Sequence, residues 1–192
     1  MNIKDSFFYT IKPESLKKTW EEFSKIINGE FKFKENIRAN VNGPIYVYSI
    51  SGKIEDFDLK IEQTVYINPG SNDQPTPLTY ILSRVTRQKI FLRIWERDLI
   101  EKIFGLNKTN SGNEKIDKKF SLKTNHIRLR QLIETNENII KVLTSSKSHF
   151  HIETKNNTLE IVYKHSGISE SNEDFLRDLE VLKLIIKEIT SL

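Results

Sequence analysis

The amino-acid sequence predicts an α+β fold: mainly an antiparallel sheet, with an N-terminal and a C-terminal helix packed on it and two short helices in the second half. Two observations support this prediction. Several segments between the end helices alternate apolar and polar residues, which is the pattern of strands with one buried and one solvated face. Helices and strands are also segregated along the chain, whereas a parallel α/β fold alternates them.

The first helix is expected at residues 13–27. Pro13 suits the first helical turn, where its missing N–H costs nothing. Apolar residues follow at spacings of three and four and form one stripe, made of Leu16, Trp20, Phe23 and Ile27. Asn28 and Gly29 then supply a left-handed C-cap. We therefore place the stripe in the core, and a ligand platform at Trp20 is the alternative.

The clearest strand is expected at residues 57–67, where Phe57, Leu59 and Ile61 alternate with charged residues. It should pair with residues 45–51 as a hairpin. Residues 68–77 contain three prolines and should form a surface loop, with a mobile flap as the alternative. The further strands of the first two thirds are expected at 31–33, 79–84, 89–95 and 118–123, and a short amphipathic piece at 97–104.

In the second half of the chain, the sequence predicts two short helices, then one hairpin, then the last helix. Two short helices are expected within residues 126–144, with Asn136 as the N-cap of the second. Residues 149–153 and 159–163 alternate and should form a hairpin. The last helix is expected at residues 172–191, because Ser171 and Asp174 have the spacing of a capping box at its start. This helix should lie across the sheet.

A chain of 192 residues suits a single domain, residues 1–192, with 1–95 and 96–192 as candidate halves. The chain contains no cysteine, which excludes disulfides, thiolate zinc sites and cysteine nucleophiles. It shows neither a signal peptide nor an apolar run long enough to span a bilayer. We therefore expect a soluble, cytoplasmic protein.

Part of the chain resembles a family. Phe91-Leu92-Arg93-Ile94, then Phe104-Gly105, then the run from Gly112 to Phe120 are similar to segments of uncharacterised bacterial proteins. Those proteins show an extended strand, a "lgk.fG" piece and a "G-D-x-x-F-D-x-x-F" run. Asn113 and Ile116 depart from the last pattern, which has Asp and Phe there. The resemblance implies a bacterial domain of unknown function, and it implies no activity and no catalytic residues.

The same run has a physical interpretation. Gly112 permits a left-handed turn. Asp117 would accept backbone N–H bonds where a strand begins, and Phe120 would anchor that strand in the core. The alternative is a carboxylate site at Glu114 and Asp117.

No motif for catalysis, a cofactor or a metal stands out. The sequence lacks the G-x-S-x-G, Walker A and Rossmann glycine patterns. We therefore predict no enzymatic activity, no cofactor and no metal. The alternative rests on His149 and His151, which should share the solvated side of one strand, and on His165, which follows the partner strand. Together with Glu153 they would suit zinc or nickel if they converged.

Charge is distributed unevenly along the chain, which carries a net charge of +4. The last helix is acidic, whereas residues 84–130 are rich in Lys and Arg. Cations interleaved with Phe91 and Trp95 would suit a phosphate backbone, and a polarised surface would equally suit protein docking. The candidate interaction surface comprises Arg84, Arg87, Lys89, Phe91, Arg93, Trp95, Lys118, Lys119, Lys123, Arg128 and Arg130.

We therefore expect a non-enzymatic binding or interaction module, with a protein partner or self-association; a bacterial immunity or accessory role would fit. A nucleic-acid-binding module that uses residues 84–130 is one alternative, and a carrier of a small apolar ligand or lipid is another. A basic stripe on one face would favour nucleic acid, and a closed apolar pocket would favour the carrier. A large exposed apolar patch around Phe91, Trp95 and Phe104 would favour a protein interface.

Overall fold

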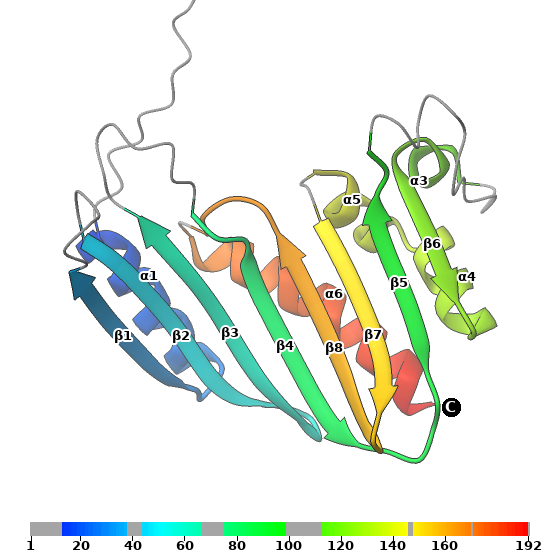
Figure 1. Ribbon diagram of the computed structural model, residues 1–192, viewed down its shortest axis with the longest axis horizontal. Helices are drawn as coiled ribbons and strands as arrows, with labels where there is room; N and C mark the ends of the chain where they lie inside the picture. The colour runs from blue at the N-terminus through cyan, green and yellow to red at the C-terminus, as the bar shows by residue number, and fades with distance from the viewer. Residues whose placement is uncertain are drawn as a thin grey trace, which may run out of the picture.

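The computed structural model describes residues 13–37, 44–66, 75–98, 113–145, 148–169 and 171–191. Its strands form one antiparallel sheet (Figure 1). In chain order the elements are α1 (Pro13–Ile26), β1 (Glu30–Ile37), β2 (Pro44–Ile54), β3 (Phe57–Tyr66), β4 (Leu78–Val85), β5 (Phe91–Glu96), α3 (Glu114–Lys119), β6 (Phe120–Thr124), α4 (Ile127–Thr135), α5 (Glu137–Ser145), β7 (Ser148–Lys155), β8 (Thr158–His165) and α6 (Asn172–Thr190). The predicted α+β class with helices near both ends is confirmed.

The strands lie in the order β1-β2-β3-β4-β8-β7-β5-β6. The β7–β8 hairpin is therefore inserted between β4 and β5, which follow each other in the chain. Both expected hairpins are confirmed, β2 with β3 and β7 with β8. The second turns at Asn156 and Asn157, whose φ angles of 49° and 60° suit a tight hairpin turn. Both candidate halves of the chain contribute strands to this one sheet.

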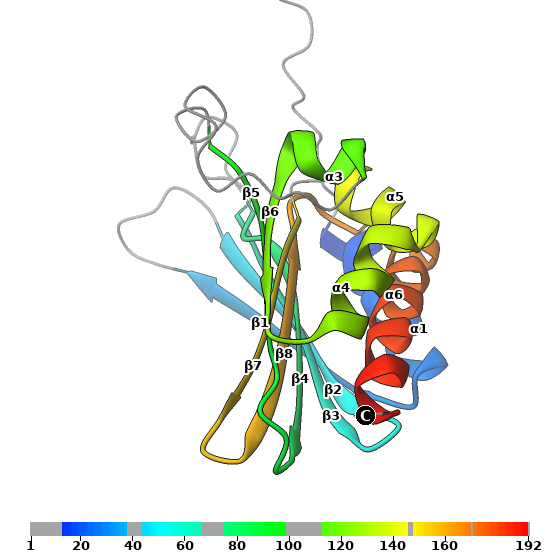
Figure 2. The ribbon, with the colours of Figure 1, turned by 90° about the vertical axis from the view of Figure 1, so that its right-hand side faces the viewer.

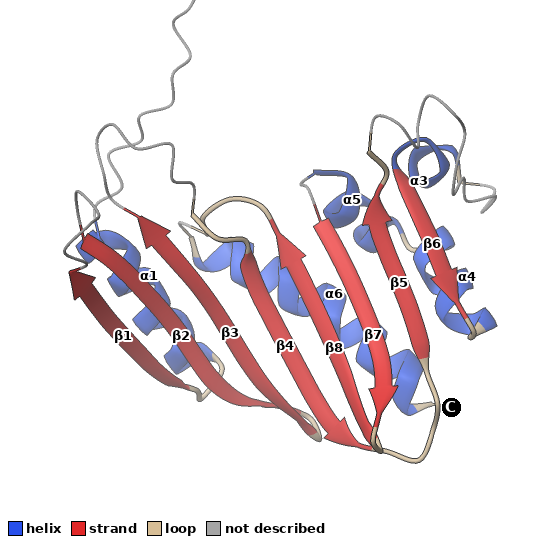
Figure 3. Ribbon diagram, in the orientation of Figure 1, coloured by secondary structure: helices blue, strands red, loops and turns tan. Residues whose placement is uncertain are grey.

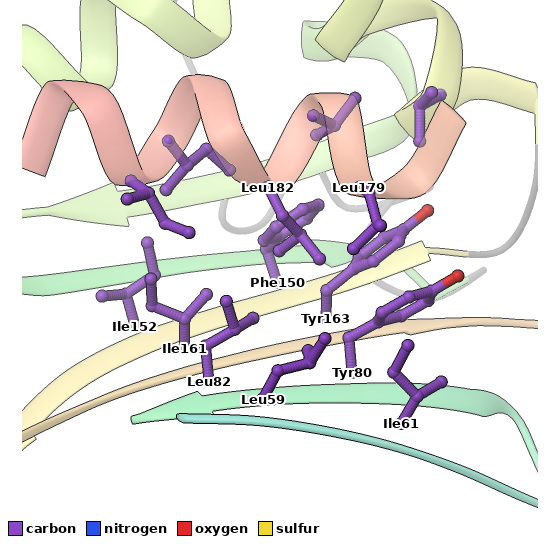
Figure 4. Packing of buried hydrophobic residues seen from close by; sticks show 14 of the residues in the cluster. Leu59, Ile61, Tyr80, Leu82, Phe150, Ile152, Ile161, Tyr163, Leu179 and Leu182 are labelled. Carbon is purple, nitrogen blue, oxygen red and sulfur yellow. The ribbon is translucent and has the colours of Figure 1, made fainter. Parts of the chain in front are cut away.

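Helices α1, α4, α5 and α6 lie on one side of the sheet (Figures 2 and 3). The strands bury alternate residues toward them, as Phe57, Leu59 and Ile61 of β3 illustrate. Leu179 and Leu182 of α6 pack over this side (Figure 4). The opposite side, which we call the open face, carries no helix of the described residues.

The N-terminal helix packs against the C-terminal one through aromatic rings. Phe175 of α6 is stacked on Phe23 at 4.5 Å between ring centroids and meets Trp20 edge-on at 5.2 Å. Trp20 is fully buried. The predicted core role of the α1 stripe is thus confirmed for Trp20, and the alternative of an exposed ligand platform is wrong because α6 covers the ring.

The expected caps are present. Asn136 Oδ1 accepts from the backbone N–H groups of Asn138 and Ile139 at the start of α5, and Ser171 Oγ accepts from that of Asp174 at the start of α6. At the end of α1, Asn28 is the left-handed residue, with φ of 51°. Gly29 serves another purpose: a Cβ there would lie 2.9 Å from Ile50 Cγ2, so glycine allows the close approach to β2.

The strand expected at 118–123 begins later, because residues 114–119 form the helix α3. Asn113 Oδ1 caps its start by accepting from Lys115 and Ile116. At its other end the buried Arg97 donates from Nη2 to the carbonyl oxygens of Asp117 and Lys118, at 2.7 and 3.0 Å. Asp117 therefore lies within a helix and not at a strand entry. Phe120 is fully buried at the start of β6, as expected.

Some expectations lie outside the described residues. These are the turn at Gly112, the position of Phe104, most of the amphipathic piece at 97–104, and most of the loop at 68–77.

Candidate binding surface

A group of cationic and aromatic residues lies on the open face of four neighbouring strands. Leu92 and Ile94 of β5 are buried toward the helices, so the intervening residues of β5 point the other way. Arg93 is opposite Lys123 of β6 and His151 of β7, and Lys164 of β8 is opposite His149. We call this group the Trp95 surface: Phe91, Arg93, Trp95, Lys123, His149, His151 and Lys164.

Trp95 is the centre of this surface. The guanidinium carbon of Arg93 is 5.2 Å from the centroid of its ring, and Lys123 Nζ is 5.5 Å from it. Both distances are within the range of cation–π attraction. Phe91 meets the ring of His151 edge-on at 6.2 Å between centroids. Trp95 and Phe91 are half-buried, whereas Arg93, Lys123 and Lys164 are exposed.

The histidines of this surface sit in a positive environment. Partial burial lowers the pKa of His149, and the charges of Arg93, His151 and Lys164 lower it further. His151 Nε2 lies 3.0 Å from Glu153 Oε2. Lys155 and then His151 lower the pKa of Glu153, so this carboxylate marks the acidic border of the surface.

The rest of the open face is different, because most of its cations are paired. On β1, β2 and β3, Lys32 pairs with Glu30, Lys53 with Asp58, and Lys60 with Glu62. Within the described part of the chain, no ion pair involves Arg93, Lys123 or Lys164. Lys34 of β1 is also exposed and takes part in none of these ion pairs. The Trp95 surface is therefore distinguished by three such cations gathered on neighbouring strands.

The structure brings together four residues of the predicted interaction surface: Phe91, Arg93, Trp95 and Lys123. The first cation of the stretch, Arg84, pairs with Asp56 at 2.8 Å and lies over the ring of Phe57 on the helix side. Arg87 and Lys89 are exposed in the connection from β4 to β5.

The remaining predicted cations lie on helices. Lys118 of α3 pairs with Glu114, and Lys119 donates to the carbonyl of Thr144 at 3.1 Å. Arg128 and Arg130 belong to α4, and Arg130 pairs with Glu134. The basic stretch therefore divides between the two sides of the sheet.

Sequence reasoning did not place His149, His151 and Lys164 beside Arg93. They are far away in the chain, and only the insertion of the β7–β8 hairpin next to β5 makes them neighbours. The sequence did indicate that all three residues lie on the solvated side of one hairpin, because they alternate with apolar residues in its two strands. It did not indicate which strand lies next to that hairpin.

The three histidines do not converge. His165 is buried on the helix side of β8, whereas His149 and His151 lie on the open face of β7. No group of three metal-ligating side chains forms within the described residues. The alternative of a zinc or nickel site at these histidines and Glu153 is thus wrong. Alternation along β8 places the His165 side chain on the helix side of the sheet, opposite to the side of His149 and His151.

His165 instead belongs to a buried polar cluster beneath α6. Its Nε2 lies 3.1 Å from Asp178 Oδ2, and Tyr163 Oη donates to Asp178 Oδ1 at 3.4 Å. Burial raises the pKa of Tyr80 well above its usual value, and the charge of Asp178 raises it further. Figure 4 shows the hydroxyl groups of Tyr80 and Tyr163 pointing the same way below the helix. Asp178 is fully buried, whereas Glu173 and Glu180 of the same acidic helix are exposed.

Within the described residues, the exposed apolar side chains do not gather around Phe91 and Trp95, and Phe104 lies outside those residues. Phe91 and Trp95 are half-buried. Among the described residues, the exposed large apolar side chains are dispersed over α1, β4, α4 and α6, as Ile26, Val85, Ile127 and Leu176.

Comparisons with known proteins were made for the whole chain, and no family model, curated protein or solved structure matches it. The resemblance to uncharacterised bacterial proteins stays a prediction. The described helices include none that combines the length and apolarity required to cross a bilayer.

Proposed function

We propose that the protein is a non-enzymatic binding module whose Trp95 surface binds an anionic macromolecule. The observation that carries this proposal is the contrast within the open face. Lys32, Lys53 and Lys60 on β1, β2 and β3 pair with neighbouring carboxylates. By contrast, Arg93 and Lys123 lie over the ring of Trp95, and Arg93 and Lys164 lie near the partly buried His149. Unneutralised cations on one surface attract an anionic partner over distances of about 10 Å at moderate salt.

The non-enzymatic part of the proposal rests on the role of the buried titratable groups. Asp178 accepts a hydrogen bond from Tyr163 and lies 3.1 Å from His165 Nε2 across the contact of α6 with β8. Such buried polar contacts join the helix layer to the sheet. We also propose a cytoplasmic location, because the chain contains no cysteine.

The experiment is retention on a sulfated polysaccharide such as heparin, which presents dense negative charge without bases or side chains. We expect the Arg93→Glu/Lys123→Glu variant to elute at clearly lower salt than the unaltered protein. The matched control is Lys32→Glu/Lys60→Glu, which changes the net charge equally on the paired part of the same face. Equal loss of retention in both variants would refute a localised surface and indicate net charge alone.

A further inference from the structure

We infer that the anionic partner is a single-stranded nucleic acid, with phosphates at Arg93, Lys123 and Lys164 and bases against Trp95 and Phe91. This inference rests on the proposed function, because it names the partner of the same surface. The inference requires three properties of the surface. Cations must be placed to contact phosphates, aromatic rings must lie beside these cations, and the sheet face must be flat enough for an unpaired strand to lie on it without a groove.

The cations and the aromatic rings alternate in space. Arg93 and Lys123 both lie within 5.5 Å of the ring centroid of Trp95. A phosphate that pairs with these two cations places its own base next to the indole ring. Base stacking on an aromatic side chain is tolerant of sequence, because every base has a π-face, and Arg guanidinium planes also stack on bases.

The shape of the support favours a single strand over a duplex. The surface spans four adjacent strands, β6, β5, β7 and β8, which corresponds to about 14 Å between the outer two. In the RNA-recognition motif, a sheet of this width stacks two or three unpaired bases. A duplex hides its base faces, and its major groove admits a helix or a two-stranded ribbon but not a wide sheet face.

The neighbouring groups favour a nucleic acid over an acidic protein. A protein interface has an apolar core, but Phe91 and Trp95 are half-buried and cations lie over the Trp95 ring. Stacking uses such rings, because a base is planar and can lie against the ring or the guanidinium. The oxygens of a phosphate can also accept two parallel hydrogen bonds from the guanidinium group of Arg93.

The number of cations predicts the salt dependence. Three phosphate contacts on a single strand give a slope of log affinity against log salt of about −2. Neutralising one cation, as in Lys164→Gln, should reduce the slope by about 0.7. Lys60→Gln, on the paired part of the open face, is the matched control and should leave the slope unchanged.

The experiment measures binding of three probes at about 50 mM salt, where the phosphate contribution is strong. The probes are oligothymidylate of about 12 nucleotides, a DNA duplex with a similar number of phosphates, and polyglutamate as an acidic polypeptide. Binding is followed by anisotropy of the labelled probe, and stacking by quenching of tryptophan fluorescence. The only other tryptophan, Trp20, is fully buried, so quenching reports on Trp95.

We expect oligothymidylate to bind most tightly and to quench the fluorescence. Trp95→Leu should weaken binding about 5- to 150-fold, the range given by loss of one stacked base. Trp95→Phe should retain the affinity within about threefold, because Phe also stacks, but lose the quenching. Circular dichroism of both variants establishes that they are folded.

The unfavourable outcomes are distinct. Equal binding of all three probes without quenching would overturn the single-stranded assignment and leave an anionic partner standing. Preference for polyglutamate would overturn it in favour of an acidic protein. No binding of any probe, heparin included, would overturn the proposed function together with this inference.

Discussion

Asp178 Oδ2 of α6 lies 3.1 Å from Nε2 of His165, the last residue of β8, and both side chains are buried. The pair joins the C-terminal helix to the centre of the sheet. Tyr163, two residues earlier on the same side of β8, donates to the other carboxylate oxygen. The position of α6 over the sheet is therefore specified by polar contacts as well as by its apolar stripe.

Replacing Asp178 with Ala should lower the free energy of unfolding by about 3 kcal/mol, because it leaves the buried partners of the carboxylate unsatisfied. Urea denaturation followed by circular dichroism measures this change. Glu173→Ala, at an exposed position of the same helix, is the control and should change the stability by less than about 0.5 kcal/mol. Similar stability of both variants would contradict a structural role for the cluster.

Gly29→Ala should destabilise the protein by about 1–3 kcal/mol, the usual cost of overpacking. The added methyl group would lie 2.9 Å from Ile50 Cγ2 and 3.0 Å from the carbonyl oxygen of Ser51. Asn28→Gly provides the opposite test, because Asn28 has a positive φ and glycine adopts it without strain. Thermal unfolding should show a lower Tm for the first variant and an equal or higher Tm for the second.

Arg97→Ala should lower the free energy of unfolding by about 1–3 kcal/mol, because the carbonyl oxygens of Asp117 and Lys118 lose a charged donor at the end of α3. Hydrogen exchange should show faster opening at residues 114–119 than in the unaltered protein. Arg87→Ala, at an exposed position, is the matched control. Unchanged exchange in α3 would show that Arg97 does not cap this helix.

Binding to the Trp95 surface should strengthen as the pH falls. Partial burial and nearby cations hold the pKa of His149 below its usual value of 6.5, so the free protein carries this imidazole uncharged at neutral pH. A bound phosphate neutralises the cations and raises the pKa, so binding takes up a proton. The affinity therefore rises as the pH falls through the pKa of the complex and levels off below the pKa of the free protein.

The size of this effect is set by the difference between the two pKa values, at about tenfold in affinity for each unit. Anisotropy titrations from about pH 7.5 to about pH 5.5 measure it, with reference to the histidine range. His149→Gln should flatten the profile, whereas His126→Gln, outside the Trp95 surface, should not. A profile that is the same in all three proteins would contradict a role for His149.

Much of the fold could be predicted from local pattern. The alternation in β3 specifies which side of the strand is buried, and the caps at Asn136 and Ser171 specify where α5 and α6 begin. These signals are readable because each depends on residues within a few positions of one another. The prediction was wrong at residues 118 and 119, because the helix there is completed by Arg97, about twenty residues earlier.

Local sequence pattern was therefore enough to predict the α+β class, the two hairpins and most helix boundaries, and the composition excludes cysteine chemistry. The strand order, and with it the candidate site, emerged from the tertiary structure alone. Alternation specifies the face of a residue but not the neighbouring strand, because backbone hydrogen bonds pair any two edges of compatible register. Inserting β7 and β8 between β4 and β5 places His151 opposite Arg93, with Lys164 one strand further along the same face. His165, on the other side of β8, faces Asp178.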